Sequence, residues 1–410
     1  MNFYFFFTLL AIILPTLIEL VSDILNSRRA AAQLPGEFKG IYPEEKYTQS
    51  QNYLKETTGC GLLEMAFFML LNIAFLALGG YNAWDMVCRK ICVNDLTAGL
   101  LFIAGIGLAQ KILSLPFSVY RTFALEAKYG FNRTTVGTFI ADQGKTFFLS
   151  VLIGGPVLAL VLWLLQSLGT LAWLYAWLSM IVIQTVIMFL APALIMPLFN
   201  RFVPLEAGEL KTAIEDLAKQ QKFDLSGIYQ MDGSKRSAKA NAFFTGFGRH
   251  RRIALFDTLI KQLTVPEIVA VLAHEIGHFK KRHIWKNMAF SILASGLMFY
   301  LLNFVIFNFE LFYGLGMRHI SVYAGLVFFS LLFGPLKMLL DAAGNVLSRR
   351  QEYEADRFAI DSGADREVFI TALKKLTVNH LGNLTPHPLK IILDYSHPPI
   401  LERIQALRRL

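Results

Sequence analysis

Charge is scarce in this sequence. Asp, Glu, Lys and Arg make up only 17% of the 410 residues, whereas 55% are hydrophobic, and the mean hydropathy is +0.47. A soluble chain of this size needs a charged fraction of about a quarter to cover its surface. The composition therefore predicts an integral membrane protein, and the length leaves room for a folded domain outside the bilayer.

Cysteine is scarce as well, and the chain contains only Cys60, Cys88 and Cys92. Three cysteines cannot form a disulfide framework, and the CxxC spacing of zinc and redox motifs is absent. We interpret all three as unpaired. A Cys88–Cys92 bridge stays open only for a loop that faces an oxidising compartment.

A soluble basic module is missing too, although the net charge is +9. The basic residues lie beside apolar segments, as they do in the cytoplasmic loops of membrane proteins, and do not gather in one region. We therefore expect no nucleic acid partner, and a lipid bilayer instead.

Seven apolar runs are long enough for membrane-spanning helices, which need about 20 residues. The first run has no basic start and no small-residue cleavage site, so it is predicted to be a retained helix and not a signal peptide. The seven runs lie near residues 3–22, 61–80, 97–117, 147–168, 171–195, 287–308 and 320–340.

The connections between these spans alternate in basic content, which predicts orientation because cytoplasmic loops carry an excess of Lys and Arg. The loop after the second span has only Arg89 and Lys90, and the loop after the sixth has only Arg318. Segments 196–286 and 341–410 are strongly basic. We expect the N-terminus outside, and both basic segments and the C-terminus in the cytoplasm.

The predicted organisation has four parts. Residues 1–195 hold five spans and 287–340 hold two, while 196–286 and 341–410 are two parts of one domain outside the bilayer. The second part of this domain is predicted to be helical. The first combines an amphipathic helix at 206–221, with Leu210, Ile214 and Leu217 on one face, and strands at 228–231, 240–247 and 251–260.

Several predicted spans contain polar residues. Such residues face either a water-filled interior or hydrogen-bond partners on neighbouring helices. The sequence leaves both alternatives open for Glu64, Asn72, Gln110, Lys111 and Gln184.

The stretch VLAHEIGHFKKRH, residues 271–283, has the spacing of a metal site. His274 and His278 are one helical turn apart, so both imidazoles point the same way, as two zinc ligands must. Glu275 lies on the same side and is placed to take a proton from a water molecule that the metal activates. Gly277 lets another element approach closely. By itself, the pattern also fits a helix with two surface histidines.

Glu352 is the predicted third ligand. Glu352 and Asp356 share one face of a later helix, so Glu352 can bind zinc while Asp356 accepts the free N–H of a ligand histidine. Glu354 points elsewhere on that helix and is predicted to be solvated. His283 lies on a different face of its helix from His278, and we interpret it as a surface or interfacial group and not a ligand.

His397 precedes two prolines that fix the backbone before the C-terminal helix. It can donate a hydrogen bond to the charge that develops on a peptide carbonyl, which is a contribution that a hydrolytic site needs. A structural histidine that caps the helix fits the spacing equally well.

These stretches together resemble the type I CAAX prenyl proteases, which are integral-membrane zinc metallopeptidases. The resemblance implies a mainly α polytopic membrane protein, with seven transmembrane helices around a large chamber and a zincin-like (gluzincin) α/β catalytic domain. It implies a zinc-dependent endopeptidase at the cytoplasmic face that removes the C-terminal tripeptide of prenylated CAAX proteins. The matching stretches are EAKYGFNRTT, IMPLFNRFVPLEAGELK, GSKRSAKANAFFTGF, RRIALFDTLI, VLAHEIGHFKKRH, SRRQEYEADRFA and SHPPILERIQAL.

The same resemblance implies one Zn²⁺ per chain, a peptide or membrane-protein substrate, and roles for individual residues. The implied metal ligands are His274, His278 and Glu352. The implied catalytic residues are the base Glu275, the proton donor Asp356, and His397 near the scissile bond. The implied substrate-binding residues, which pair with an extended peptide, are Asn241, Ala242 and Phe243.

The compact chain, which ends soon after the HPP motif without an ER-retention signal, favours a bacterial member in the inner membrane. Other functions stay open: a membrane-protein quality-control protease with no prenyl requirement, an intramembrane protease of the site-2 type, or a transporter or scaffold with a structural zinc. Lys280, Lys281 and Arg282 argue against the site-2 type, because they place the motif at the membrane boundary. Only three ligands can be named, whereas a structural zinc needs four.

Overall fold

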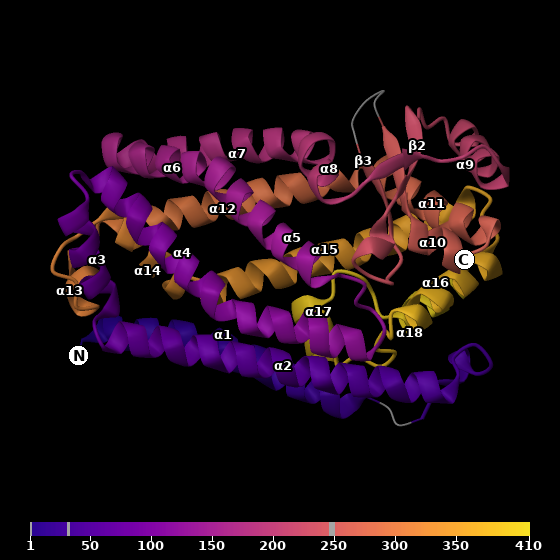
Figure 1. Ribbon diagram of the computed structural model, residues 1–410, viewed down its shortest axis with the longest axis horizontal. Coiled ribbons are helices and arrows are strands. Elements are labelled where there is room, and N and C mark those ends of the chain that lie inside the picture. The colour runs from indigo at the N-terminus through magenta and orange to yellow at the C-terminus, as the bar shows by residue number, and fades with distance from the viewer. Residues whose placement is uncertain (1, 31–32, 246–250) are drawn as a thin grey trace.

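The computed structural model describes residues 2–30, 33–245 and 251–410. A long membrane region is followed at one end by a domain that contains the sheet (Figure 1). The elements of the first half are α1 (Phe3–Arg29), η1 (Gly36–Phe38), α2 (Glu44–Ala77), α3 (Gly80–Ile91), α4 (Asp95–Val119), η2 (Tyr120–Glu126), α5 (Val136–Leu149), η3 (Ser150–Gly154), α6 (Gly155–Ser167), η4 (Gly169–Leu171), α7 (Ala172–Leu190), η5 (Ala191–Ile195) and α8 (Met196–Phe199).

The second half holds the sheet and the helices that carry the candidate site residues. Its elements are β1 (Phe202–Pro204), α9 (Glu209–Gln220), β2 (Gly227–Met231), η6 (Gly233–Lys235), β3 (Ala242–Thr245), β4 (Arg252–Phe256), α10 (Asp257–Gln262), α11 (Val265–Lys280), α12 (His283–Ile306), α13 (Phe309–Gly314), α14 (Val322–Leu332), α15 (Gly334–Asp361), α16 (Arg366–Asn379), α17 (Pro388–Asp394) and α18 (Ile400–Arg408).

Six stretches of the described chain are long and apolar enough to cross a membrane, which confirms the first six predicted spans. The seventh differs from the single helix expected at 320–340, because α14 and α15 meet at an angle of 60°. Pro335 lies in the first turn of α15, where its missing N–H is tolerated but a continuous helix is broken. The second half of this bent span then continues as one helix to Asp361.

Buried hydrophobic residues of the described chain form two clusters. One joins α3, α4, α12 and α14 around Phe102 and Tyr323, and the other joins the sheet to α11, α16 and α18 around Leu255 and Phe369. Two spans bury little: 6% of an 18-residue apolar window in Glu44–Ala77, and none of such a window in Gly169–Phe199. Helices in a solid bundle each bury one face, so these two spans do not pack as members of a solid bundle.

Polar residues in the spans follow both alternatives that the sequence left open. Glu64 accepts from Arg121 at 2.6 Å, and Asn72 accepts from the Tyr81 hydroxyl at 3.3 Å, so these two bond to neighbouring helices. Gln184 instead lines a cavity of about 330 Å³ between α7 and α12. Gln110 and Lys111 have exposed side chains.

All three cysteines are free, as the sequence predicts. Cys88 lies buried in α3 and Cys92 follows one turn later at the end of this helix. The disulfide between Cys88 and Cys92, which the sequence left as an alternative, is absent.

The sheet has the strand order β1-β2-β4-β3, with β2 and β4 parallel and both outer strands antiparallel. The predicted helix at 206–221 is α9, which packs with α11 against one face of the sheet through Ile214 and Leu217. The strand expected at 251–260 ends at Phe256, because Asp257 begins α10. Positions 246 and 247 of the strand expected at 240–247 lie outside the described residues.

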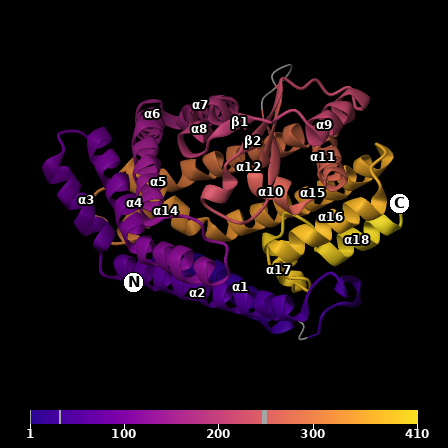
Figure 2. The same ribbon diagram turned by 45° about the vertical axis from the view of Figure 1, so that its right-hand side comes forward.

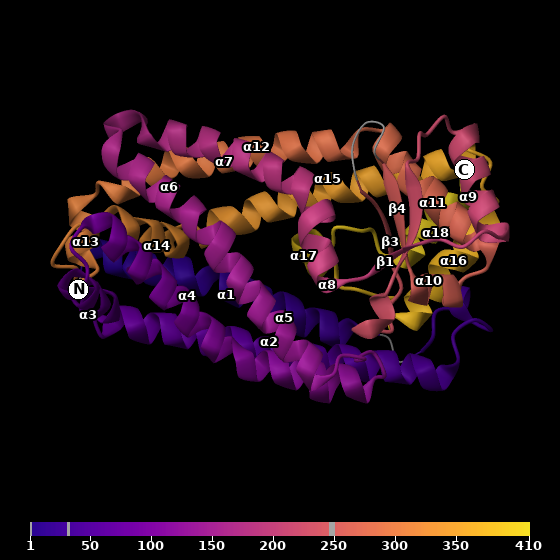
Figure 3. The same ribbon diagram turned by 45° about the horizontal axis from the view of Figure 1, so that its top comes forward.

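Strand β3 is an edge strand within the described sheet. It pairs only with β4, where Phe243 lies opposite Ala254. Helices α16 and α18 share a core with the sheet and lie near it in Figure 2, and Figure 3 shows α12 and α15 extending from the membrane region to this sheet domain. The domain is therefore joined directly to the sixth and seventh spans.

Helices α11 and α15 approach closely at Gly277. A Cβ atom added to Gly277 would lie 3.1 Å from both Cα and the carbonyl oxygen of Ala355. Since these are backbone atoms of a helix, they cannot turn aside as a side chain can. The expectation that Gly277 admits another element is confirmed.

The substitution Gly277→Ala is expected to destabilise the domain by about 1–3 kcal/mol, because overpacking forces the two helices apart. It should also reduce the zinc content of the purified protein, since the ligands lie on both helices. Gly59→Ala in α2, where no atom lies within 4 Å of the added Cβ, is the matched control and should not destabilise. Thermal unfolding in detergent checks this, and equal midpoints for Gly277→Ala and the wild type would contradict it.

Candidate metal centre and active site

Helix α11 positions the two histidines of the metal motif. It begins with a capping box, in which the Thr264 N–H donates to the Glu267 carboxylate at 2.8 Å. One face of α11 is buried against α15 and α16, and His274 on this face is only 5% exposed. His278 follows one turn later, and the Nε2 atoms of the two rings lie 3.1 Å apart.

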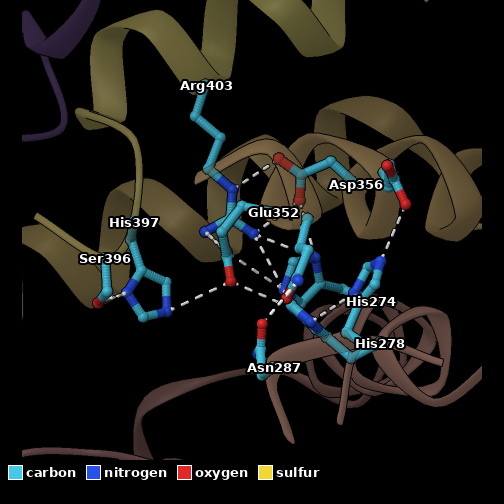
Figure 4. A network of polar contacts seen from close by, with 11 residues as sticks. His274, His278, Asn287, Glu352, Asp356, Ser396, His397 and Arg403 are labelled. Atoms are coloured by element: carbon cyan, nitrogen blue, oxygen red, sulfur yellow. Dashed lines mark hydrogen bonds and ion pairs between the residues drawn. The ribbon is translucent and has the colours of Figure 1, made fainter. Parts of the chain in front are cut away.

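Glu352 of α15 completes a cluster with these histidines. Its Oε1 lies 3.2 Å from Nε2 of His278, and its Oε2 lies 3.5 Å from Nε2 of His274. Figure 4 shows the carboxylate between the histidines of α11 and Arg403 of α18. The described structure thus brings together the three metal ligands that the sequence predicts.

The spacing of this cluster fits a zinc ion. Two atoms bound to one tetrahedral zinc at about 2.1 Å lie about 3.4 Å apart. The two histidine Nε2 atoms are 3.1 Å apart, and they lie 3.5 and 3.2 Å from the two different oxygens of Glu352, which is close to that value. The Oε2 atom of Glu352 is buried and makes no hydrogen bond, although Arg403 Nη1 lies 3.2 Å away. No hydrogen bond satisfies this buried oxygen, so it remains available to a metal ion, and two imidazoles with one carboxylate are a donor set that zinc prefers.

Asp356 is in direct contact with the ring of His274. Its Oδ1 lies 2.8 Å from Nδ1 of His274, so this nitrogen donates to the carboxylate and Nε2 keeps its lone pair for a metal. Asp356 is 2% exposed and is absent from the described residues that line the active-site cavity. Its position fits the role expected from helical spacing, orientation of a ligand histidine, better than the proton donation that the resemblance implies.

Arg403 is the principal site residue that the sequence interpretation missed. Its Nε and Nη2 atoms each donate to Asp356 at 2.6 Å, and the side chain is almost completely buried. The signal was present in the helical period, because Arg403 lies on the same face of α18 as the buried Ile404 and Leu407. A charged residue at an apolar position of an amphipathic helix requires a buried partner of opposite charge.

Of the two alternatives expected for His283, a surface or an interfacial group, the surface alternative is wrong, since the residue is only 1% exposed. Its Nδ1 lies 3.0 Å from Nδ1 of His278, and its Nε2 lies 3.0 Å from Oε2 of Glu354. It is therefore behind the metal cluster and not a ligand, as expected. Glu354 is about half exposed, but this contact makes it more than a solvated acid.

A cavity of about 410 Å³ opens beside the metal cluster. Glu275 and His397 both line it, together with His274 and Glu352. His397 is largely exposed, with Nε2 3.4 Å from Oε1 of Glu352 and Nδ1 2.9 Å from Ser396 Oγ. The expected base and the expected donor thus reach the same space as the metal ligands.

The predicted substrate segment reaches this cavity in part. Asn241 and Ala242, at the start of β3, line it, whereas Phe243 packs edge-on against Phe256. His380, which the sequence interpretation did not single out, accepts from the Ala240 N–H at 2.9 Å. Burial lowers the pKa of His380 to about 4, so its ring is neutral near pH 7 and its Nε2 is free to accept.

The fold and the site together define an integral-membrane zinc metallopeptidase. Its two histidines and one glutamate lie on helices α11 and α15, in the part of the chain that contains the sheet domain. Two family models match this chain. One, described as "CAAX prenyl protease N-terminal, five membrane helices", covers residues 23–201, and the other, "Peptidase family M48", covers residues 204–410. The chain belongs to peptidase family M48 and is a metalloendopeptidase, which confirms the resemblance.

Individual relatives agree over nearly the whole length. The "CAAX prenyl protease 1 homolog" of Arabidopsis thaliana is 36% identical, over 91% of this chain and 90% of that protein. The human "CAAX prenyl protease 1 homolog" is 35% identical over 93% and 90%, respectively. The crystal structure of S. mikatae Ste24p matches with a TM-score of 0.94 and 30% identity, over 99% of both chains. These relatives are eukaryotic, and the bacterial origin expected above stays a prediction.

The substitution Arg403→Met is expected to lower the free energy of unfolding by about 3–5 kcal/mol, because it leaves the buried Asp356 carboxylate without its cation. Arg403→Lys should restore little, since an ammonium group cannot bind both carboxylate oxygens in the plane of a guanidinium. Arg409→Met, at the exposed C-cap of the same helix, is the control. The measurements are denaturant unfolding and zinc content, and wild-type values for Arg403→Met would refute the assignment.

Proposed function

We propose that this protein hydrolyses peptide bonds near the C-terminus of prenylated CAAX proteins at the cytoplasmic face of the membrane. The relatives in Arabidopsis thaliana and in humans, both named CAAX prenyl protease 1 homolog, support this substrate class. The observation that carries the proposal is the edge of β3, which begins at the cavity that holds His274, Glu275 and Glu352. An edge strand binds an extended peptide through main-chain hydrogen bonds.

We propose one zinc ion per chain, held by His274, His278 and Glu352. When bound, it would polarise the substrate carbonyl and make water more acidic. Asp356 orients His274 and in turn is oriented by Arg403, so we assign Asp356 to positioning and not to proton donation. Its burial behind His274 supports this assignment.

The remaining roles follow from the residues that line the cavity. Glu275 takes a proton from the attacking water and passes it to the leaving amine. His397, at the exposed side of the cavity, donates to the oxyanion that forms on the peptide carbonyl. The backbone of Asn241, Ala242 and Phe243 pairs with the substrate, and His380 fixes the preceding Ala240 by its hydrogen bond.

The motif helix also supports a site outside the bilayer. Helix α11 has 16 residues and is not among the described stretches that could span a membrane, so the site differs from a site-2 intramembrane site. Family membership likewise favours a protease over a transporter or scaffold.

The substitution Glu275→Gln is expected to lower cleavage of a farnesylated CAAX peptide by at least about 10²–10⁴-fold, because the amide cannot accept a proton. Zinc content should be unchanged, since Glu275 is not a ligand. Glu206→Gln, at an exposed loop position, is the matched control. Retained cleavage in Glu275→Gln would remove the base assignment. A zinc-loaded wild type that cleaves other peptides but not this one would remove the substrate class.

We further propose the four-part division at residues 195, 286 and 340, with the N-terminus outside and the C-terminus in the cytoplasm. Helix α15 continues through residue 340 without a break. The proposed division at this residue therefore separates the part of the helix in the membrane from the part outside it, and not two elements of secondary structure. Exposed Lys280, Lys281 and Arg282 at the junction of α11 and α12 support the orientation.

A labelling experiment tests this orientation. In a background with all three native cysteines replaced, Lys281→Cys should react with an impermeant thiol reagent only after the cells are permeabilised. Arg318→Cys, in the opposite loop between α13 and α14, should react in intact cells and serves as the matched position. The reverse pattern would invert the orientation.

A further inference from the structure

His283 is a buried polar residue that the proposed mechanism does not use. It is the first residue of α12 and is 1% exposed. The preceding Arg282 has φ +57°, in the left-handed region that residues other than glycine rarely adopt. This conformation ends α11 abruptly and turns the chain, so that the ring of His283 lies next to that of His278. The ring centroids are 5.0 Å apart.

The contacts of His283 form a chain with one consistent placement of protons. His278 directs Nε2 to the metal cluster, so its proton must be on Nδ1, which lies 3.0 Å from Nδ1 of His283. Nδ1 of His283 therefore accepts, and its own proton is on Nε2. That nitrogen lies 3.0 Å from the Glu354 carboxylate, to which it donates. Each member thus determines the tautomer of the next.

Glu354 is the last member of this series of hydrogen bonds, and it comes from α15, the helix that also carries Glu352. It lies on α15, two residues after Glu352, and also accepts from Lys286 Nζ at 3.0 Å. The carboxylate therefore receives one donor from the ring of His283 and one from a cation on α12. His274 has a direct carboxylate partner in Asp356, whereas His278 is connected to its carboxylate through a second imidazole.

We propose that His283 and Glu354 are positioning residues that hold His278 in the tautomer and orientation required for metal binding. The inference rests on the zinc site proposed above. Carboxylate partners of ligand histidines raise the basicity of the ligand and fix its ring, and their loss typically costs 10–100-fold in metal affinity. Here the effect passes through His283.

The test is zinc affinity, measured by competition with a chelating indicator on the purified full-length protein in detergent. His283→Phe keeps the ring volume but removes both nitrogens, and Glu354→Ala removes the acceptor. Each should weaken zinc binding by about 10–100-fold. Glu354→Gln keeps an acceptor oxygen and should restore most of the affinity. Asp361→Ala, an exposed acid at the end of the same helix, is the matched control.

The double variant separates this chain from a general loss of packing. If His283 acts through Glu354, the combined variant should bind zinc no more weakly than the weaker single variant. Losses that multiply would overturn the coupling, and wild-type affinity in both single variants would overturn the proposal. If His283→Phe does not fold, Glu354→Ala decides, because its side chain is 46% exposed and contributes little packing. A wild type without zinc would instead refute the proposed zinc enzyme.

Discussion

The close contact between α11 and α15 is the constraint on which the site depends. A glycine in the metal motif lets the backbone at Ala355 come near, and this approach brings Glu352 within 3.2 Å of His278. Helix α12 follows directly on α11, and α15 begins at Gly334 as the second half of a bent span. Both ligand-bearing helices are therefore joined to the membrane region, and the metal cluster lies where that region meets the sheet domain.

Buried charge is what this contact has to accommodate. Glu352 and Asp356 are each at most 3% exposed, and an unpaired carboxylate at such a depth is strongly unfavourable. Arg403 contributes one cation to the pair, and its guanidinium lies against Asp356 on two bonds. Arg403 also lies 3.2 Å from Glu352, and a zinc ion would add a second cation beside that carboxylate. The hydrogen bonds and ion pairs that Asp356 makes with Arg403 and His274 therefore lie on the buried side of the metal cluster, and the cavity lies on the other side.

The side of the metal cluster that faces the cavity differs from the buried side in which polar groups it presents. The edge of β3 begins at the cavity, and His380 fixes the backbone there as a neutral acceptor for Ala240. Glu275 and His397 reach the same space without the tight partners that surround Asp356. Two of the spans, Glu44–Ala77 and Gly169–Phe199, bury 6% or less of an 18-residue apolar window, so the membrane region is not a uniformly packed bundle.

The sequence by itself determined what depends on spacing along one helix. The first six spans, the shared face of His274 and His278, and the choice of Glu352 as the third candidate ligand all follow from length and the 3.6-residue period. Only the tertiary structure decided which helices meet. Arg403 lies 129 residues from His274, and His283 turns inward because of one backbone conformation at its helix start. Periodicity shows which residues share a face, but the partner of that face depends on packing between distant segments.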